Sequence, residues 1–138
     1  MTFTSRKSIL LVRNPTAGRR RRGLVDEVVR LVRDAGWSVD LVDTAGAGDA
    51  RRLAETCDAE RYPVIAVAGG DGTINEVASA LAFTQTPLGI VPSGSGNGLA
   101  RELGIPFVPQ EAMRIAVDGR DRVIDAGELD GHLFFNIA

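Results

Sequence analysis

One segment of the chain, Val64–Glu76, constrains the fold more than any other. It reads VIAVAGGDGTINE, so an apolar run typical of a buried strand leads directly into Gly69-Gly70-Asp71-Gly72, and a helix is predicted from Thr73. This order places a glycine turn, free backbone N–H groups and the partially positive end of a helix at one point. Such a point binds phosphate, and we therefore expect a phosphate-binding turn here.

The carboxylate inside this turn suggests phosphate chemistry. Asp71 would repel a phosphate unless it binds a metal ion through water or accepts the proton of an attacking hydroxyl, and the sequence leaves both roles open. A structural alternative exists, because Thr73-x-x-Glu76 fits a capping box and Asp71 fits a helix cap. That alternative does not explain three glycines around one acid. Asn75 either holds the loop or contacts a phosphate.

A second glycine loop, Pro92–Gly98, follows a predicted strand at 88–91. Hydroxyl groups and Asn97 within a glycine turn form a good anion nest. An ordinary turn with Ser95 as a helix cap is the alternative. The functional interpretation gains weight because the first glycine loop is expected at the same edge of the sheet.

Strands and helices alternate along most of the chain, which predicts a three-layer α/β/α fold with a mostly parallel sheet. Ligands of such sheets bind at the carboxyl ends of the strands. The loops Asn14–Gly18 and Thr44–Gly48 are expected at that edge too. The predicted strands cover 8–13, 37–42, 63–68 and 88–91. The predicted helices cover 23–34, a stretch that Asp49 could cap and that runs to about Cys57, 73–82, a short stretch through Leu103, and 109–117.

Composition narrows the possible functions. The chain has 138 residues, a formal net charge of −2 and 44% apolar residues, which indicates a soluble globular domain. The slightly acidic, aromatic-poor composition argues against nucleic-acid binding. A P-loop of the G-x-x-x-x-G-K-[ST] type is excluded because Lys7 is the only lysine. The single cysteine and the polar N-terminus predict a cytoplasmic protein, and no metal site of the Cys/His type is expected.

The end of the chain departs from the alternating pattern. Residues 122–129 and 132–137 are predicted to form a β-hairpin around Asp130-Gly131.

Four motifs, taken together, resemble the diacylglycerol kinase catalytic-domain family, which includes bacterial lipid kinases, sphingosine kinases and ceramide kinases. The resemblance covers nearly the whole chain. Gly98 departs from the Asp of many bacterial members, which leaves the lipid head group open. The motifs are, in order, Asn14-Pro-x-Ala-Gly18, Thr44-x-x-x-Gly-Asp-Ala50, Gly69-Gly-Asp-Gly-Thr-x-Asn-Glu76 and Pro92-x-Gly-Ser-Gly-Asn97.

The resemblance implies an ATP-dependent kinase that uses Mg²⁺ and phosphorylates a lipid hydroxyl, with Asp71 as the catalytic acid. Glu76 would contact ATP, as the corresponding acid does in sphingosine kinases. The first two motifs and the Gly-Ser-Gly-Asn loop would contact the nucleotide, and the segment from Gly69 would cradle its phosphates. The implied nucleotide-binding residues are Asn14, Pro15, Thr16, Ala17, Gly18, Thr44, Gly69, Gly70, Asp71, Gly72, Thr73, Ile74, Asn75, Glu76, Gly94, Ser95, Gly96 and Asn97.

The resemblance also implies a domain division. Residues 1–120 would form the ATP-binding domain, and 121–138 would begin a β-rich second domain whose remainder is missing from this chain. That domain supplies lipid-binding surface and further carboxylates in relatives. We therefore expect the fragment mainly to bind nucleotide, the full-length protein to work peripherally at the inner membrane surface, and exposed strand edges to favour self-association. The alternatives are a NAD kinase-like enzyme, which shares Gly-Gly-Asp-Gly, and a non-catalytic nucleotide-binding or interaction module.

Overall fold

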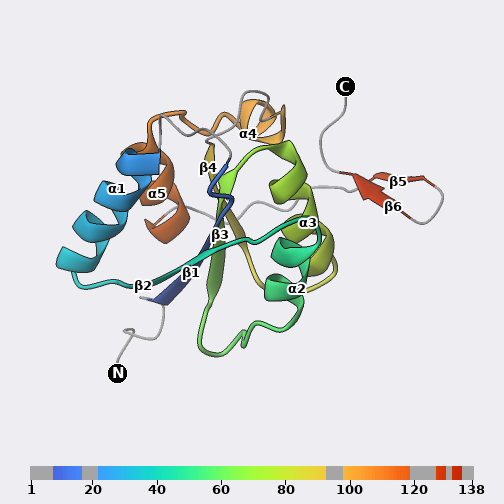
Figure 1. Ribbon diagram of the computed structural model, residues 1–138, viewed down its shortest axis with the longest axis horizontal. Coiled ribbons are helices and arrows are strands. Elements are labelled where there is room, and N and C mark those ends of the chain that lie inside the picture. Colours follow the sequence, from blue (N-terminus) through green and yellow to red (C-terminus); the bar gives the residue numbers. More distant parts are fainter. Residues whose placement is uncertain (1–7, 17–21, 93–97, 119–126, 130–131, 135–138) are drawn as a thin grey trace.

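A four-stranded parallel sheet forms the centre of the molecule (Figure 1). The computed structural model describes residues 8–16, 22–92, 98–118, 127–129 and 132–134. The predicted α/β class is confirmed, and each predicted strand is present to within a residue at either end. The strands are β1 (Ser8–Arg13), β2 (Ser38–Asp43), β3 (Val64–Gly69) and β4 (Leu88–Pro92), in the order β2-β1-β3-β4.

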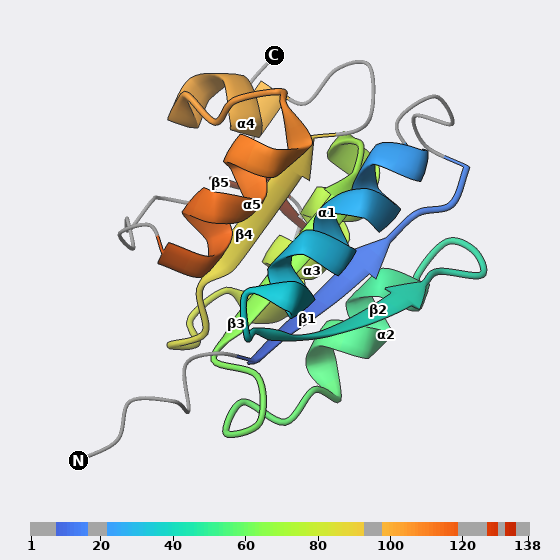
Figure 2. The same ribbon diagram turned by 90° about the vertical axis from the view of Figure 1, so that its left-hand side faces the viewer.

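Helices cover both faces of the sheet. Helices α1 (Arg22–Asp34) and α5 (Pro109–Asp118) lie side by side on one face (Figure 2), and α2 (Asp49–Glu55) and α3 (Asp71–Leu81) lie on the other. Helix α4 (Gly98–Leu103) follows β4 and packs on the α2–α3 side. None of the helices in the described ranges has the length and apolar character needed to cross a membrane.

Alternation along the strands explains why both faces are covered. In β1, Ile9 and Leu11 join the apolar cluster under α1 and α5, whereas Leu10 and Val12 join the cluster under α2, α3 and α4. Successive side chains of a strand point to opposite faces, so a strand that is apolar throughout needs helices on both sides.

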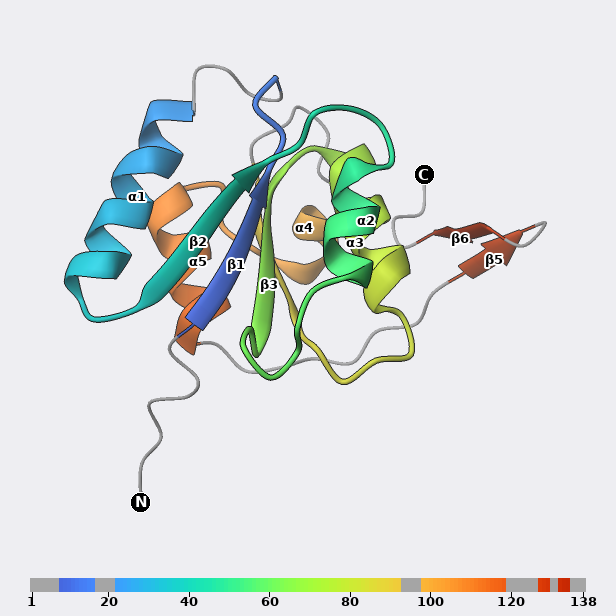
Figure 3. The same ribbon diagram turned by 60° about the horizontal axis from the view of Figure 1, so that its bottom comes forward.

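A short antiparallel hairpin lies outside the main sheet. It consists of β5 (Gly127–Leu129) and β6 (His132–Phe134), and β6 contacts α3 (Figure 3). The predicted hairpin is confirmed as a strand pair over these residues. Its Asp130-Gly131 turn and residues 119–126 and 135–138 lie outside the described part of the chain.

Two helix starts differ from the sequence prediction. Helix α3 begins at Asp71 rather than Thr73, because β3 ends at Gly69 and the glycine turn itself forms the first helical turn. Helix α2 has Gly48 as its N-cap, at a φ of 84°, instead of the predicted Asp49. The Asp49 carboxylate accepts the N–H of Ala45 in the preceding loop at 2.8 Å and also pairs with Arg52 of α2, so it connects the loop to the helix without capping it.

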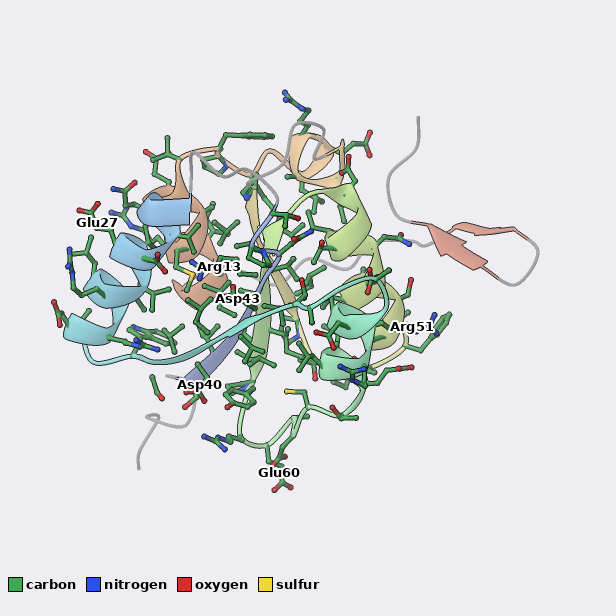
Figure 4. The ribbon with its side chains drawn as sticks, in the orientation of Figure 1. Arg13, Glu27, Asp40, Asp43, Arg51 and Glu60 are labelled. Carbon is green, nitrogen blue, oxygen red and sulfur yellow. The ribbon has the colours of Figure 1, made fainter. Side chains whose placement is uncertain are left out.

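A buried arginine joins the carboxyl ends of β1 and β2 to α1. Arg13 is only 7% exposed, and its guanidinium donates to both carboxylate oxygens of Asp43, at 2.7 and 3.1 Å, and to Asp26 at 2.7 Å. Figure 4 shows Arg13 and Asp43 close together between α1 and β2. The two carboxylates raise the pKa of Arg13, with the Asp43 hydrogen bonds as the largest cause. This ion-pair cluster fixes the strand ends from which two of the predicted site loops leave.

We predict that Asp43→Ala destabilises the fold more than Arg13→Met. Removal of Asp43 leaves a buried guanidinium short of acceptors, at a cost of about 1–3 kcal/mol or more. Methionine at position 13 instead leaves two carboxylates whose side chains are 40% and 56% exposed and can be hydrated. Urea denaturation with equal m-values would measure both changes. Asp26→Ala is the milder control, and greater destabilisation by Arg13→Met would contradict the prediction.

A second prediction concerns the packing of α5 on β4. A Cβ atom added to Gly89 would lie 2.7 Å from the Cβ of Ala116, so α5 rests directly on the strand backbone. Gly89→Ala should cost about 1–3 kcal/mol through overpacking. The double variant with Ala116→Gly should recover part of that loss in thermal unfolding. Independent, additive effects of the two substitutions would contradict direct contact.

Candidate functional site

The predicted site loops all leave from one edge of the sheet. In the strand register Arg13 pairs with Asp43 and with Ala68, and Gly69 pairs with Pro92, so the four strands end at one level. The connection from β1 leads to β2 on one side, and the connection from β3 leads to β4 on the other side. The strand order thus reverses between β1 and β3, and sheets of this kind bind ligands at such a point. Ala17, Gly18, Gly94, Ser95, Gly96 and Asn97 lie outside the described residues.

Asn14 connects the loop after β1 to the start of α3. Its backbone N–H donates to the carbonyl of Ala68 at 3.0 Å, and its Nδ2 donates to the Oγ1 of Thr73 at 3.3 Å. Its Oδ1 accepts the N–H of Thr16 at 3.0 Å and the Thr16 hydroxyl at 2.8 Å, which closes a local turn around Pro15. The first and third motifs thus form one hydrogen-bonded unit. On the other side of β1, the N–H of Thr44 donates to the carbonyl of Arg13 at 2.8 Å.

The N-terminus of α3 has no side-chain cap. Its N-cap is Gly70, and the first backbone bond of the helix runs from the N–H of Ile74 to the carbonyl of Gly70 at 3.0 Å. The N–H groups of Asp71, Gly72 and Thr73 precede that bond and so lack intrahelical acceptors. The capping-box alternative is wrong, because Thr73 lies inside the first turn and its hydroxyl accepts from Asn14. Among the described residues, the helix end therefore keeps uncapped N–H donors, and it carries a partial positive charge.

Two glycines of the turn have different physical reasons to be glycine. A Cβ at Gly69 would lie 3.0 Å from the Cβ of Thr73, so the fold itself limits that position. A Cβ at Gly72 would meet no atom of the described residues within 4 Å, and Gly72 is exposed with no positive φ. None of the described residues therefore requires glycine at position 72. A group that approaches the backbone N–H from outside would require it.

Asp71 connects α3 to α4. Its Oδ1 accepts the backbone N–H of Gly98 at 2.7 Å, so this carboxylate serves the neighbouring helix and not the end of its own. Asn75 lies one helical turn later, on the same face of α3. Its Oδ1 is buried and has no hydrogen-bond partner among the described residues. A carboxylate and an unused amide oxygen therefore lie near each other beside the helix N-terminus.

Glu76 contacts α2. Its Oε1 accepts the backbone N–H of Arg51 at 3.4 Å, a long hydrogen bond. Figure 4 shows Arg51 on α2, beside α3. The side chain of Glu76 is partly buried in this contact, so the predicted pairing with Thr73 in a capping box is wrong.

Besides Arg13, two groups with raised pKa values lie away from the site loops. The hydroxyl of Tyr62 donates to Asp40, which raises the pKa of Tyr62, and burial raises the pKa of Cys57. Asp40 and Glu60 appear away from Arg13 and Asp43, toward the amino ends of the strands (Figure 4). Within the described ranges no group of three or more His, Cys, Asp or Glu side chains could hold a metal ion. The described part of the site thus consists of backbone N–H groups at the start of α3 and the carboxylate of Asp71.

Sequence reasoning missed two parts of this arrangement. Arg13 carried a weak signal, as a charged residue at the end of an apolar strand directly before Asn14-Pro15. The bond from Gly98 to Asp71 carried none, because its donor is a backbone N–H.

Comparisons with known proteins show which family the chain is related to. The family profile described as "Diacylglycerol kinase catalytic domain" matches residues 8–129. Diacylglycerol kinases of Staphylococcus aureus strains JH9 and Newman are 34% identical over 137 residues, which cover 96% of this chain and 43% of theirs.

Solved structures give the same result. A crystal structure of a diacylglycerol kinase from Bacillus anthracis strain Sterne superposes with a TM-score of 0.80 and 27% identity over 93% of this chain and 45% of that one. A further structure from the same organism gives a TM-score of 0.81. The chain spans less than half the length of these relatives. Its profile match, its curated relatives and its fold show that the chain belongs to the diacylglycerol kinase catalytic-domain family.

Proposed function

We propose that this chain is the nucleotide-binding part of an ATP-dependent lipid kinase and binds the phosphates of ATP over the N-terminus of α3. The observation that carries the proposal is the combination of uncapped N–H donors with open space at Gly72. A negatively charged group that approaches there gains hydrogen bonds and the favourable end of the helix dipole. The adjoining loop at Asn14–Thr16 forms a second wall, because Asn14 is bonded to Thr73.

The residues at this edge fit a magnesium ion bound together with the nucleotide. Mg²⁺ prefers oxygen ligands and is commonly held by one or two carboxylates plus substrate phosphates. Asp71 supplies the carboxylate, and the buried, unpartnered Oδ1 of Asn75 supplies a second oxygen on the same face of α3. Bound there, the ion would offset the phosphate charge that Asp71 otherwise repels. Asp71 and Asn75 would hold it, while the α3 N–H groups orient the phosphates.

The phosphoryl acceptor in this proposal is the hydroxyl of a lipid, at the cytoplasmic surface of a membrane. Support comes from family membership, since the similar proteins are named diacylglycerol kinases. Phosphoryl transfer demands mainly positioning and charge stabilisation, and a backbone cradle with one acid supplies both. The proposal assigns the lipid-binding surface and any further carboxylates to parts of the whole protein beyond this chain.

The sharpest test of the nucleotide site compares Gly72→Ala with Gly23→Ala. Each glycine is the second residue of its helix, and a Cβ at either position would meet no atom within 4 Å. Each substitution should stabilise the unliganded fold by about 0.5–1 kcal/mol or leave it unchanged. Only the methyl group at position 72 should obstruct a phosphate.

Thermal unfolding with and without ATP-Mg would measure the difference. Binding to the folded state alone stabilises it by about 2.7 kcal/mol at a hundredfold excess of ligand over Kd. We expect this ligand-induced shift in the unsubstituted chain and in Gly23→Ala, and a much smaller shift in Gly72→Ala. Equal shifts in both variants would place the nucleotide elsewhere, and no shift in any of the three proteins would remove the ATP proposal.

A transfer assay tests the acceptor class. The chain would be incubated with labelled ATP-Mg and either vesicles carrying diacylglycerol, vesicles carrying sphingosine, or NAD in solution. Labelled lipid that is lost with Asp71→Asn would support a lipid kinase. Labelled NADP would contradict it, and nucleotide binding without transfer to any acceptor would make this chain a nucleotide-binding module.

A further inference from the structure

We propose that Asp71 is a positioning residue in addition to its role as the acid of the site. One oxygen of its carboxylate fixes the first turn of α4 to the first turn of α3, so the two helices that enter the site edge from β3 and β4 move as one unit. The inference rests on the proposed function only where ATP binding is measured. Hydrogen exchange of α4 is measured without any ligand and does not depend on the proposed function.

The geometry of the contact supports a strong bond. Gly98 is the first residue of α4, and the N–H at that position has no acceptor within its own helix. The distance of 2.7 Å to Oδ1 of Asp71 is in the range of charge-assisted N–H···O⁻ bonds. The acceptor of this N–H thus belongs to another helix.

Helix α4 depends on such outside contacts. It has only 6 residues, and helices of this length are marginal on their own. Its buried side chains, Leu99 and Ala100, belong to the apolar cluster on the α2–α3 side of the sheet. Apolar contacts are non-directional, whereas the bond to Asp71 is directional and selects one placement of the helix start.

The other acid of the same helix makes a weaker contact of the same kind. Glu76 accepts the N–H of Arg51, the third residue of α2, at 3.4 Å. The two acids of α3 therefore each accept a backbone N–H from the first turn of a neighbouring helix, Asp71 from α4 and Glu76 from α2. The distances predict that loss of the Asp71 carboxylate disturbs α4 more than loss of the Glu76 carboxylate disturbs α2.

Two substitutions separate the charge of Asp71 from its hydrogen bond. Asp71→Asn removes the charge and keeps an oxygen that can accept the N–H of Gly98. Asp71→Ala removes both. Without metal, the negative charge of Asp71 repels phosphate, so Asp71→Asn should bind free ATP at least as tightly as the unsubstituted chain. Asp71→Ala also lacks that repulsion, and any deficit relative to Asp71→Asn reports the lost positioning.

Hydrogen exchange by mass spectrometry on the 138-residue chain without ligand gives the structural readout. Amides of α4 should exchange about tenfold faster in Asp71→Ala, the size of effect expected for one lost cap, and within about threefold of the unsubstituted rate in Asp71→Asn. Glu76→Ala, with Glu76→Gln as its own conservative control, should change the amides of α2 by a smaller factor. Unchanged α4 exchange in Asp71→Ala, or equal loss in Asp71→Asn, would overturn the proposal.

Gly98→Pro provides an independent variant that leaves Asp71 in place. Proline removes the donor and is well tolerated at the first position of a helix. In this background Asp71→Ala should no longer change α4 exchange, whereas a tenfold change that persists would show that Asp71 acts by another route. If Asp71→Ala fails to fold, Gly98→Pro by itself tests the inference, because it removes the same bond and should speed α4 exchange about tenfold relative to the unsubstituted chain.

Titration of ATP without and with Mg²⁺ completes the test. Without metal, we expect Asp71→Asn to bind ATP more tightly than Asp71→Ala does. Addition of Mg²⁺ should increase the ATP affinity most in the unsubstituted chain. Equal affinities of the two variants without metal would show that the contact does not position the nucleotide site. Absence of ATP binding by every protein would remove the proposed function, while the exchange results would still decide the role of Asp71 toward α4.

Discussion

The parallel alignment of four strands, three of them largely buried, is the constraint on which the rest of the structure depends. Because β1 and β3 are apolar on both faces, helices must return the chain across both sides, and every strand then ends at the same edge. The polar groups that follow the strands are consequently close together in space, although they are far apart along the chain. The buried Arg13 bonds to Asp43 and Asp26. It thereby holds the ends of β1 and β2 together and connects them to α1.

Helix α3 organises the edge that the sheet creates. Its N-terminus supplies donors, its first-turn threonine accepts from Asn14, and its two acids accept from the first turns of α4 and α2. These side chains bond to neighbouring elements and not to the start of their own helix. Among the described residues, no side chain therefore caps the N–H groups at the start of α3. This explains how a sequence that resembles a capping box can leave its helix uncapped.

Much of the fold was predictable from local pattern. The apolar runs and glycine turns located all four strands, the alternation of strands and helices gave the parallel three-layer class, and Asp130-Gly131 indicated a hairpin whose two strands are present. The boundaries were less predictable. Helix α3 starts at Asp71 because glycines that pattern reading assigns to a loop also fit a first helical turn, and Gly48 rather than Asp49 precedes α2 because its positive φ suits glycine.

The sequence by itself determined the class of fold, the identity of the glycine turn and the expectation that Asn14, Thr44 and Asp71 lie at one edge, because strand and helix periodicity and turn chemistry are local properties. Tertiary structure alone decided the partners: which carboxylate holds Arg13, that Asp71 serves α4, and that the oxygen of Asn75 has no partner among the described residues. These contacts join elements far apart in the chain, often through backbone N–H groups that every residue type but proline carries. Such donors leave no mark in a sequence, and only the packing of the helices on the sheet brings them to a particular acceptor.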